Sequence, residues 1–205
     1  MREFKGRVVT PGTVTAPALV SHGGLNTLAS FQKALQFGDK KATCGDQNNP
    51  DLYGQQMVGK ALCLPQTIGS TTGGLVLYCA CAMERQPACM LFSKPIDSLA
   101  AAGSILASVW LEGVTMPVID QLGDEFLEAV KTGDTLEVRE DGTVVILYIN
   151  ALQRPGELQG AASFLYTKTR QPKLPGSALR EIMPELFSYA PAGTAERLRR
   201  SAWKP

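Results

Sequence analysis

The alternation of apolar and polar residues along the first 150 positions predicts a chain of short strands and helices. Residues 7–10 and 13–20 have the pattern of two strands. Pro11-Gly12 between them is a turn pair, because proline presets φ and glycine tolerates a positive φ. We therefore predict that the chain opens with a β-hairpin.

A strand–helix–strand unit is predicted in the middle of the chain. Residues 60–64 and 88–92 are short apolar runs, typical of buried strands. Residues 72–84 between them have helical spacing, with four apolar side chains expected on one face: Leu75, Val76, Cys79 and Met83. A helix between two buried strands implies parallel pairing with a right-handed crossover.

The pattern after residue 95 predicts two helices, a short strand and a second hairpin. The helices and the strand cover residues 98–109, 124–131 and 116–119. Asp141-Gly142 separates two β-rich runs, 136–139 and 143–147, which is a strong hairpin signal. The predicted fold class is α/β: a β/β/α or α/β sandwich with β-hairpins at both ends and βαβ units in the centre.

Two segments differ from this pattern in composition. Residues 38–55 are rich in Gly, Asp, Asn and Pro, and we expect a long loop with few core residues. Residues 151–205 contain six of the chain's 13 prolines, which exclude a long helix. We therefore predict one domain over residues 1–150, followed by an irregular, poorly packed extension over residues 151–205.

The charge of the chain indicates which kinds of partner it is suited to bind. The net charge is +1 over 205 residues, which favours neither a nucleic-acid surface nor an acidic tail. Residues 1–150 carry 11 basic and 15 acidic side chains, a net charge of −4, whereas residues 151–205 carry 9 and 4, a net charge of +5. The extension is thus either solvated or suited to an acidic surface. Without a leader or a membrane-spanning run, we expect a reduced, cytoplasmic protein.

The five cysteines do not have the spacing of a metal site. Cys79 and Cys81 are two residues apart on a predicted helix, so their thiols point in different directions. Cys63 and Cys89 lie in apolar strands and resemble small core residues. Cys44, in the long loop, is the thiol that we expect to be exposed. We predict no metal site in this chain.

His22 is the only histidine, so a Ser–His–Asp triad or a multi-histidine metal site is not predicted. Its neighbours, Gly23-Gly24, favour a turn, and a phosphotransfer role for His22 is the weaker alternative. Asp46 and Asp51 lie in the long loop, where carboxylates are usually solvated or make Asx turns.

The strongest candidate for chemistry is the loop Gly69-Ser70-Thr71-Thr72-Gly73, between a short apolar strand and a helix. Free N–H groups at a helix start form an anion site. Ser70 is either a helix N-cap, for which serine is favoured, or a reactive hydroxyl. The loop has neither the spacing of a nucleophile elbow nor the lysine of a P-loop.

This loop and its flanks resemble a known family, aconitase X, in its small subunit or swivel domain. Gly6-Arg7-Val8-Val9-Thr10-Pro11-Gly12 is similar to the family's opening, and the run Pro50–Leu62 to the segment before its active-site loop. Gly69–Gly73 matches the Gly-Ser-Ser/Thr-x-Gly core of that loop. The resemblance covers roughly residues 5–147, in order and at plausible spacing.

The resemblance implies a swivelling β/β/α domain that caps a large iron–sulfur subunit. Its members dehydrate small hydroxy acids, among them phosphomevalonate and cis-3-hydroxyproline. Ser70 would be the general base, and Gly69, Thr71, Thr72 and Gly73 would bind the substrate's anionic end. The iron–sulfur cluster would be carried by the large subunit and none would be bound by this chain.

Two departures from the family pattern keep a second hypothesis open. Gly74 stands where the family usually has a second serine, and Gln66-Thr67-Ile68 replaces an Arg/Gly-rich approach to the loop. The first hypothesis is a hydro-lyase subunit that is inactive without its large partner. The second is a diverged, non-catalytic binding or assembly module of the same fold.

Overall fold

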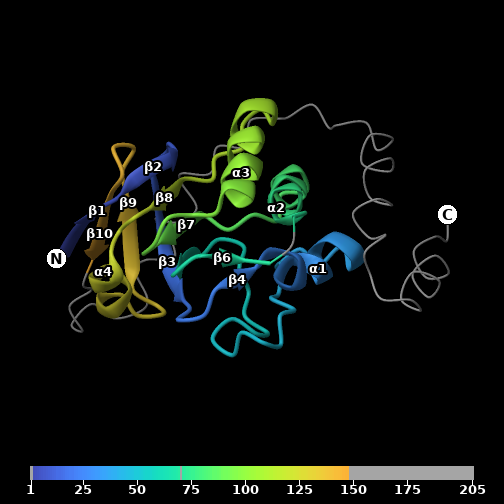
Figure 1. The fold of residues 1–205 in the computed structure, drawn as a ribbon, viewed down its shortest axis with the longest axis horizontal. Helices are drawn as coiled ribbons and strands as arrows, with labels where there is room; N and C mark the ends of the chain where they lie inside the picture. Colours follow the sequence, from blue (N-terminus) through green and yellow to red (C-terminus); the bar gives the residue numbers. More distant parts are fainter. Residues whose placement is uncertain (1, 70, 148–205) are drawn as a thin grey trace, which may run out of the picture. The chain divides into compact units, whose positions relative to one another are not determined.

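The computed structural model describes residues 2–69 and 71–147 (Figure 1). Its elements are, in chain order, β1 (Arg2–Lys5), β2 (Arg7–Thr10), β3 (Val14–Val20), β4 (Leu25–Asn26), α1 (Thr27–Phe37), β5 (Ala61–Leu64), β6 (Thr67–Ile68), α2 (Gly73–Ala82), β7 (Cys89–Phe92), α3 (Ser98–Trp110), β8 (Val118–Asp120), α4 (Asp124–Ala129), β9 (Thr135–Val138) and β10 (Thr143–Leu147). The α/β class is as predicted.

Eight of the strands form one mixed sheet in the order β1-β10-β9-β3-β5-β7-β8-β2. Strand β3 joins its two halves: residues 14–17 pair antiparallel with β9, and residues 18–20 pair parallel with β5. The strands at the two ends of this order, β1 and β2, are separated in sequence by Gly6 alone. The sheet therefore curls back on itself. A Cβ at Gly6 would lie 2.5 Å from the carbonyl oxygen of Asp120, so the closure requires glycine.

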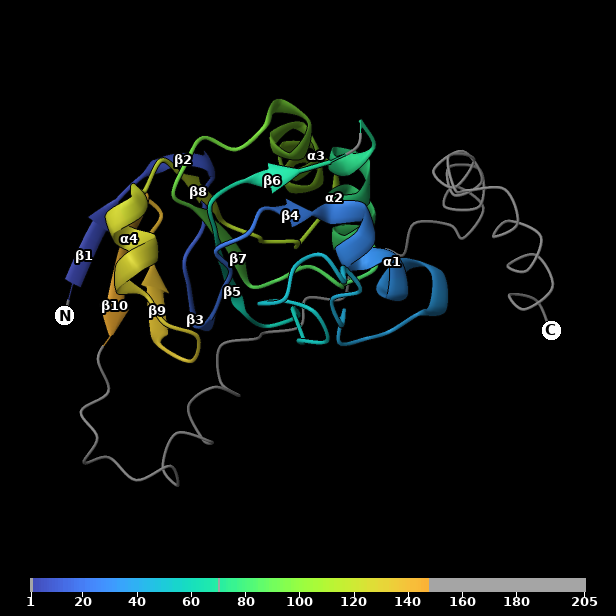
Figure 2. The same ribbon diagram turned by 60° about the horizontal axis from the view of Figure 1, so that its bottom comes forward.

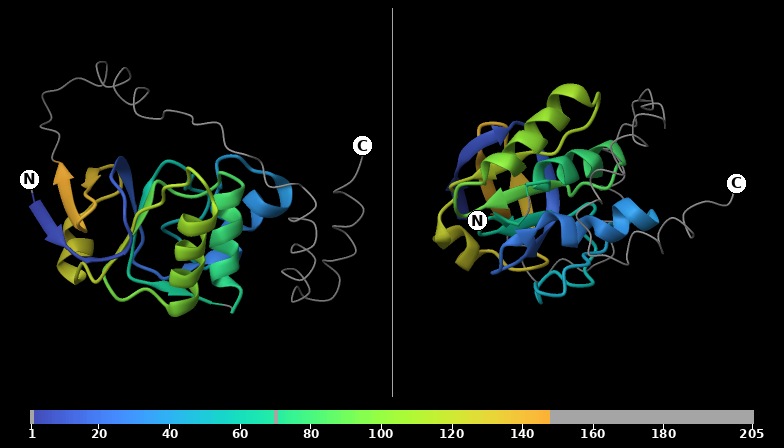
Figure 3. Two further views of the ribbon diagram at one scale, coloured as in Figure 1. Left: turned by 90° about the horizontal axis from the view of Figure 1, so that it is seen from above. Right: turned by 45° about the vertical axis from the view of Figure 1, so that its right-hand side comes forward.

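The two faces of the sheet carry different parts of the core. Ala61 and Cys63 of β5 belong to an inner cluster that α4 completes with Phe126. Leu62 and Leu64 alternate with them and are fully buried on the opposite face, as expected for a strand covered on both sides. Helices α1, α2 and α3 lie together away from α4 (Figures 1 and 3), and α2 packs along α3.

The central unit and the second hairpin confirm the sequence predictions. Strands β5 and β7 pair in parallel on either side of α2. Strands β9 and β10 pair antiparallel around Gly142, whose φ is +86°. Helix α2 is shorter than predicted, and Leu75, expected on its buried face, is 40% exposed.

The predicted opening hairpin is wrong. Both of its strands exist, but β2 pairs with β8 and β3 pairs with β5 and β9. The apolar side chains of β3, such as Leu19 and Val20, are buried, which favours a central position. The alternation of apolar and polar residues along a strand indicates that one face of the strand is buried, but it does not indicate which strand pairs with it.

The segment between α1 and β5 is more closely packed than predicted. Leu52 and Met57 have no exposed surface, and Cys44, expected to be exposed, has none either. The backbone of Cys44 donates to the carbonyl of Gln55 at 2.9 Å and accepts from the N–H of Gly54 at 3.0 Å. These bonds fold the loop over its own apolar side chains, so composition alone gave a misleading prediction.

The predicted extension over residues 151–205 lies outside the described residues, and the proposed boundary at 150 stays a prediction. None of the helices within residues 2–69 and 71–147 is long and apolar enough to cross a membrane.

Candidate functional site

The loop Gly69–Gly73 connects β6 to α2, beside the start of α1 (Figure 2). Strand β6 pairs in parallel with β4, so Asn26 lies opposite Ile68. Gly69 has a φ of +115°, a region that favours glycine, and a Cβ there would lie 3.3 Å from the side chain of Asn26. Ser70, the predicted general base, lies outside the described residues.

Two helix N-termini meet at this loop. Asn26 is the N-cap of α1, and its Oδ1 accepts a hydrogen bond from the N–H of Ala29 at 3.2 Å. Helix α2 begins at Gly73, where a Cβ would lie 3.1 Å from Oγ1 of Thr27, the first residue of α1. The partial positive charges of both helices therefore act on the same place.

The start of α2 differs from the other two helix starts nearby. The side chain of Thr72, the N-cap of α2, does not make the capping hydrogen bond to the helix. Asp97 caps α3 by accepting from the N–H groups of Leu99 and Ala100. Asp97 also accepts a hydrogen bond from Thr67, which holds β6 and the base of the loop against α3. The first N–H groups of α2 are thus suited to an anionic ligand.

The remaining predicted loop residues are arranged along the helix start. The side chain of Thr71 is exposed, Thr72 is half-buried, and Gly73 is buried against α1. Thr71 is therefore the described side chain of the loop that is most accessible to a ligand or a partner.

Gly74, a departure from the family pattern, has a packing explanation. A Cβ at Gly74 would overlap the carbonyl group of Leu99 on α3, and a Cβ at Gly103 would lie 2.5 Å from the Cα of Gly74. The backbones of α2 and α3 touch at this pair of glycines, which leaves no space for a serine at position 74. The missing serine is therefore tied to the approach of α3, and does not by itself indicate a damaged loop.

His22 is held at a different place, at the end of β3. Its backbone N–H donates to Oδ2 of Asp51 at 2.8 Å, and its Nδ1 lies 3.3 Å from the same oxygen. It lines a hollow with Lys131 and Thr132, whereas the loop Gly69–Gly73 does not contribute to that hollow. Asp46 accepts from the N–H of Asn48 at 3.0 Å, an Asx-type bond, which is one of the two alternatives expected for the carboxylates of this loop.

The cysteines are all buried. Burial raises the pKa of Cys89 to about 12, and it also raises the pKa of Cys63 well above the ordinary thiol range. Within residues 2–69 and 71–147, no group of three or more His, Cys, Asp or Glu side chains could hold a metal ion.

Sequence reasoning missed two elements of this site. Helix α1 was not predicted, although Asn26 before its first residue and Gly38 after its last, with a φ of +71°, are typical start and stop signals. Asp97, the N-cap of α3, was not singled out from sequence either, although the hydrogen bond that it accepts from Thr67 anchors the base of the loop.

Comparison with known proteins gives one family. The family model described as "Aconitase X swivel domain" matches residues 3–146. The phosphomevalonate dehydratase small subunit of Methanocella arvoryzae is 29% identical over 148 residues, which are 72% of this chain and 99% of that protein. The protein of the same name from Methanocaldococcus jannaschii is 28% identical over 148 residues, 72% of this chain and 98% of that protein.

A solved structure has the same fold. The crystal structure of Thermococcus kodakaraensis aconitase X in its holo-form superposes with a TM-score of 0.59 at 25% sequence identity. The match covers 72% of this chain and 100% of that chain.

Proposed function

The chain belongs to the aconitase X swivel-domain family, and from this premise we propose that it is the small subunit of a hydro-lyase that dehydrates a small hydroxy acid. The two relatives named as phosphomevalonate dehydratase small subunits make a phosphorylated hydroxy acid the first substrate to test. The observation that carries the proposal is the convergence of the α1 and α2 N-termini on the loop Gly69–Gly73.

In this proposal the loop supplies a base and an anion cradle. Ser70 removes a proton from the carbon next to the substrate's carboxylate. The N–H groups of Gly69, Thr71, Thr72 and Gly73, at the start of α2, hold the anionic end of the substrate. The helix N-termini also favour an anion on the serine oxygen, which a hydroxyl needs in order to act as a base.

The other half of the site is proposed to lie on a large partner subunit. An iron–sulfur cluster on that subunit would supply the Lewis acid for the departing hydroxyl. Neither subunit then has a complete site, so we expect this chain to be inactive alone.

Reconstitution with the large subunit tests the role of Ser70. We expect Ser70→Ala to lower kcat by at least about 10²-fold, the usual contribution of a general base, while the complex still forms. Thr15→Ala, at an exposed position of β3 far along the sheet from the loop, is the control and should keep normal turnover. If Ser70→Ala retained near-normal turnover, the non-catalytic alternative would be favoured.

A further inference from the structure

Helices α2 and α3 together present an apolar surface to the solvent. Neither helix contains a charged residue. On α3, Leu99, Leu106, Val109 and Trp110 are between 37% and 69% exposed, and on α2 Leu75 is 40% exposed. We call these five side chains the α2–α3 face. A contiguous apolar surface of this kind typically marks an interaction site.

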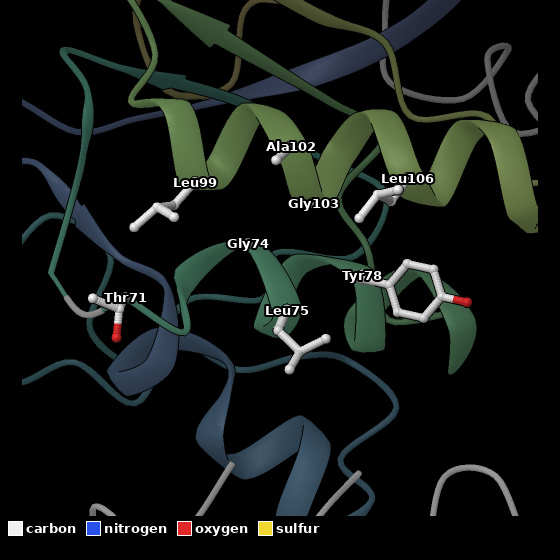
Figure 4. A pocket seen from close by; sticks show the side chains of 8 residues that line it. All are labelled: Thr71, Gly74, Leu75, Tyr78, Leu99, Ala102, Gly103 and Leu106. Atoms are coloured by element: carbon white, nitrogen blue, oxygen red, sulfur yellow. The ribbon is translucent and has the colours of Figure 1, made fainter. Parts of the chain in front are cut away.

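A hollow of about 170 Å³ opens between the two helices on this face (Figure 4). Its floor is the contact between Gly74 and Gly103, and Leu99, Ala102 and Leu106 of α3 line one side. The glycine pair creates the hollow because it removes two side chains at the point where the helices cross. The space suits one apolar side chain.

The hollow is continuous with the candidate site. Thr71 belongs both to the loop and to the lining of the hollow, at the end nearest the start of α2 (Figure 4). A subunit that closes over the loop must therefore also cover the hollow and the helices beside it.

From this continuity we propose that the α2–α3 face is the docking surface for the cluster-bearing large subunit, and that an apolar side chain of that subunit fills the hollow. The inference rests on the proposed function, which requires a second subunit at the loop. The matching surface should be apolar and poor in charge, because a charged group set against α2 and α3 would lose its water without gaining a partner.

A second copy of this chain is the less suitable occupant. A symmetric pair formed through the α2–α3 face would set the same surface of each copy against the other. Each Thr71 would then be covered by another swivel domain, and the large subunit could not reach the loop.

The test measures the dissociation constant between the full-length chain and the large subunit. Leu106→Glu places a charge on the face, and Ala102→Phe fills the hollow from an exposed position without touching the glycine pair. We expect each to weaken binding by roughly 10²-fold, as for a buried interface anchor. Phe37→Glu changes a 65% exposed side chain at the end of α1 and should bind normally. Circular dichroism verifies that all three variants are folded.

The outcomes separate this inference from the proposed function. Weaker binding of Leu106→Glu and Ala102→Phe, with Phe37→Glu unchanged, supports the docking surface. Normal binding of both face variants in a complex that depends on Ser70 for turnover overturns the docking surface and leaves the proposed function intact. Two results favour another occupant or none, and each overturns the docking surface: a wild-type chain that does not bind the large subunit, or a dimer of the chain that Leu106→Glu dissociates.

Discussion

The contact between Gly74 and Gly103 gives a sharp prediction for stability, because the usual effect of the substitution has the opposite sign. Gly103→Ala would place a Cβ 2.5 Å from the Cα of Gly74, whereas ordinary contact begins at 3.4 Å. The helices must therefore separate by at least about 0.9 Å. The obstacle is backbone, which cannot rotate away as a side chain can, so we expect the upper end of overpacking costs, about 3 kcal/mol.

Replacing glycine by alanine inside a helix normally stabilises it by about 1 kcal/mol. The net effect of Gly103→Ala should therefore be a loss of about 2 kcal/mol in the free energy of unfolding. Urea denaturation and a fall in Tm of about 4–8 °C would report it. Ser108→Ala, an exposed change on the same helix, should alter the free energy by less than about 0.5 kcal/mol.

A double-mutant cycle strengthens the test. Gly74→Ala meets the same obstacle from the other helix. Once one alanine has separated the helices, the second should cost less, so the double variant should lose at least about 1 kcal/mol less than the sum of the single losses. A Gly103→Ala variant that is more stable than wild type, or strictly additive costs, would refute the close contact.

Three further predictions concern other parts of the domain. Arg7→Met should cost about 3 kcal/mol in urea denaturation, because it leaves the fully buried Asp120 without the bidentate partner that now donates at 2.9 and 2.6 Å; a loss below about 1 kcal/mol would contradict this. The hydrogen bond from Lys5 lowers the pKa of Asp141 to about 2. The ionised carboxylate therefore stabilises the folded state above its unfolded pKa of about 3.9, and this stabilisation is lost as the pH falls through about 2. Lys5→Met should raise the pKa of Asp141, and an NMR titration of wild-type Asp141 near about 3.9 would contradict the prediction. The five cysteines should react with a thiol reagent at pH 8 only after unfolding, and rapid labelling of the native protein would disprove their burial.

Local signals in the sequence predicted the elements that depend on neighbouring residues. Asp141-Gly142 identified the β9–β10 hairpin, because the turn requires a residue that accepts positive φ at Gly142. Apolar runs identified β5 and β7, because strands buried on both faces leave no polar alternation.

Features that depend on distant residues were not predictable in the same way. The opening hairpin failed because β2 and β3 take partners more than 40 residues away in the sequence, such as Ala61 for Ala18. From sequence, Gly74 was interpreted as the loss of a family serine. Its close contact with the backbone of α3, which explains the glycine, becomes visible only in the structure. The loop Gly69–Gly73 was singled out from sequence and stays a prediction as a site, but Asn26 and Asp97, which hold its two sides, come from other elements.

The pairing of β1 with β10 has a consequence for how the domain is made. Arg2 lies opposite Ile146, so during synthesis β1 has to wait for nearly the last strand of the domain before it can pair. Until β10 has been made, β9 has β3 as a neighbour on one side only. The sheet then has exposed edges that invite association with other chains.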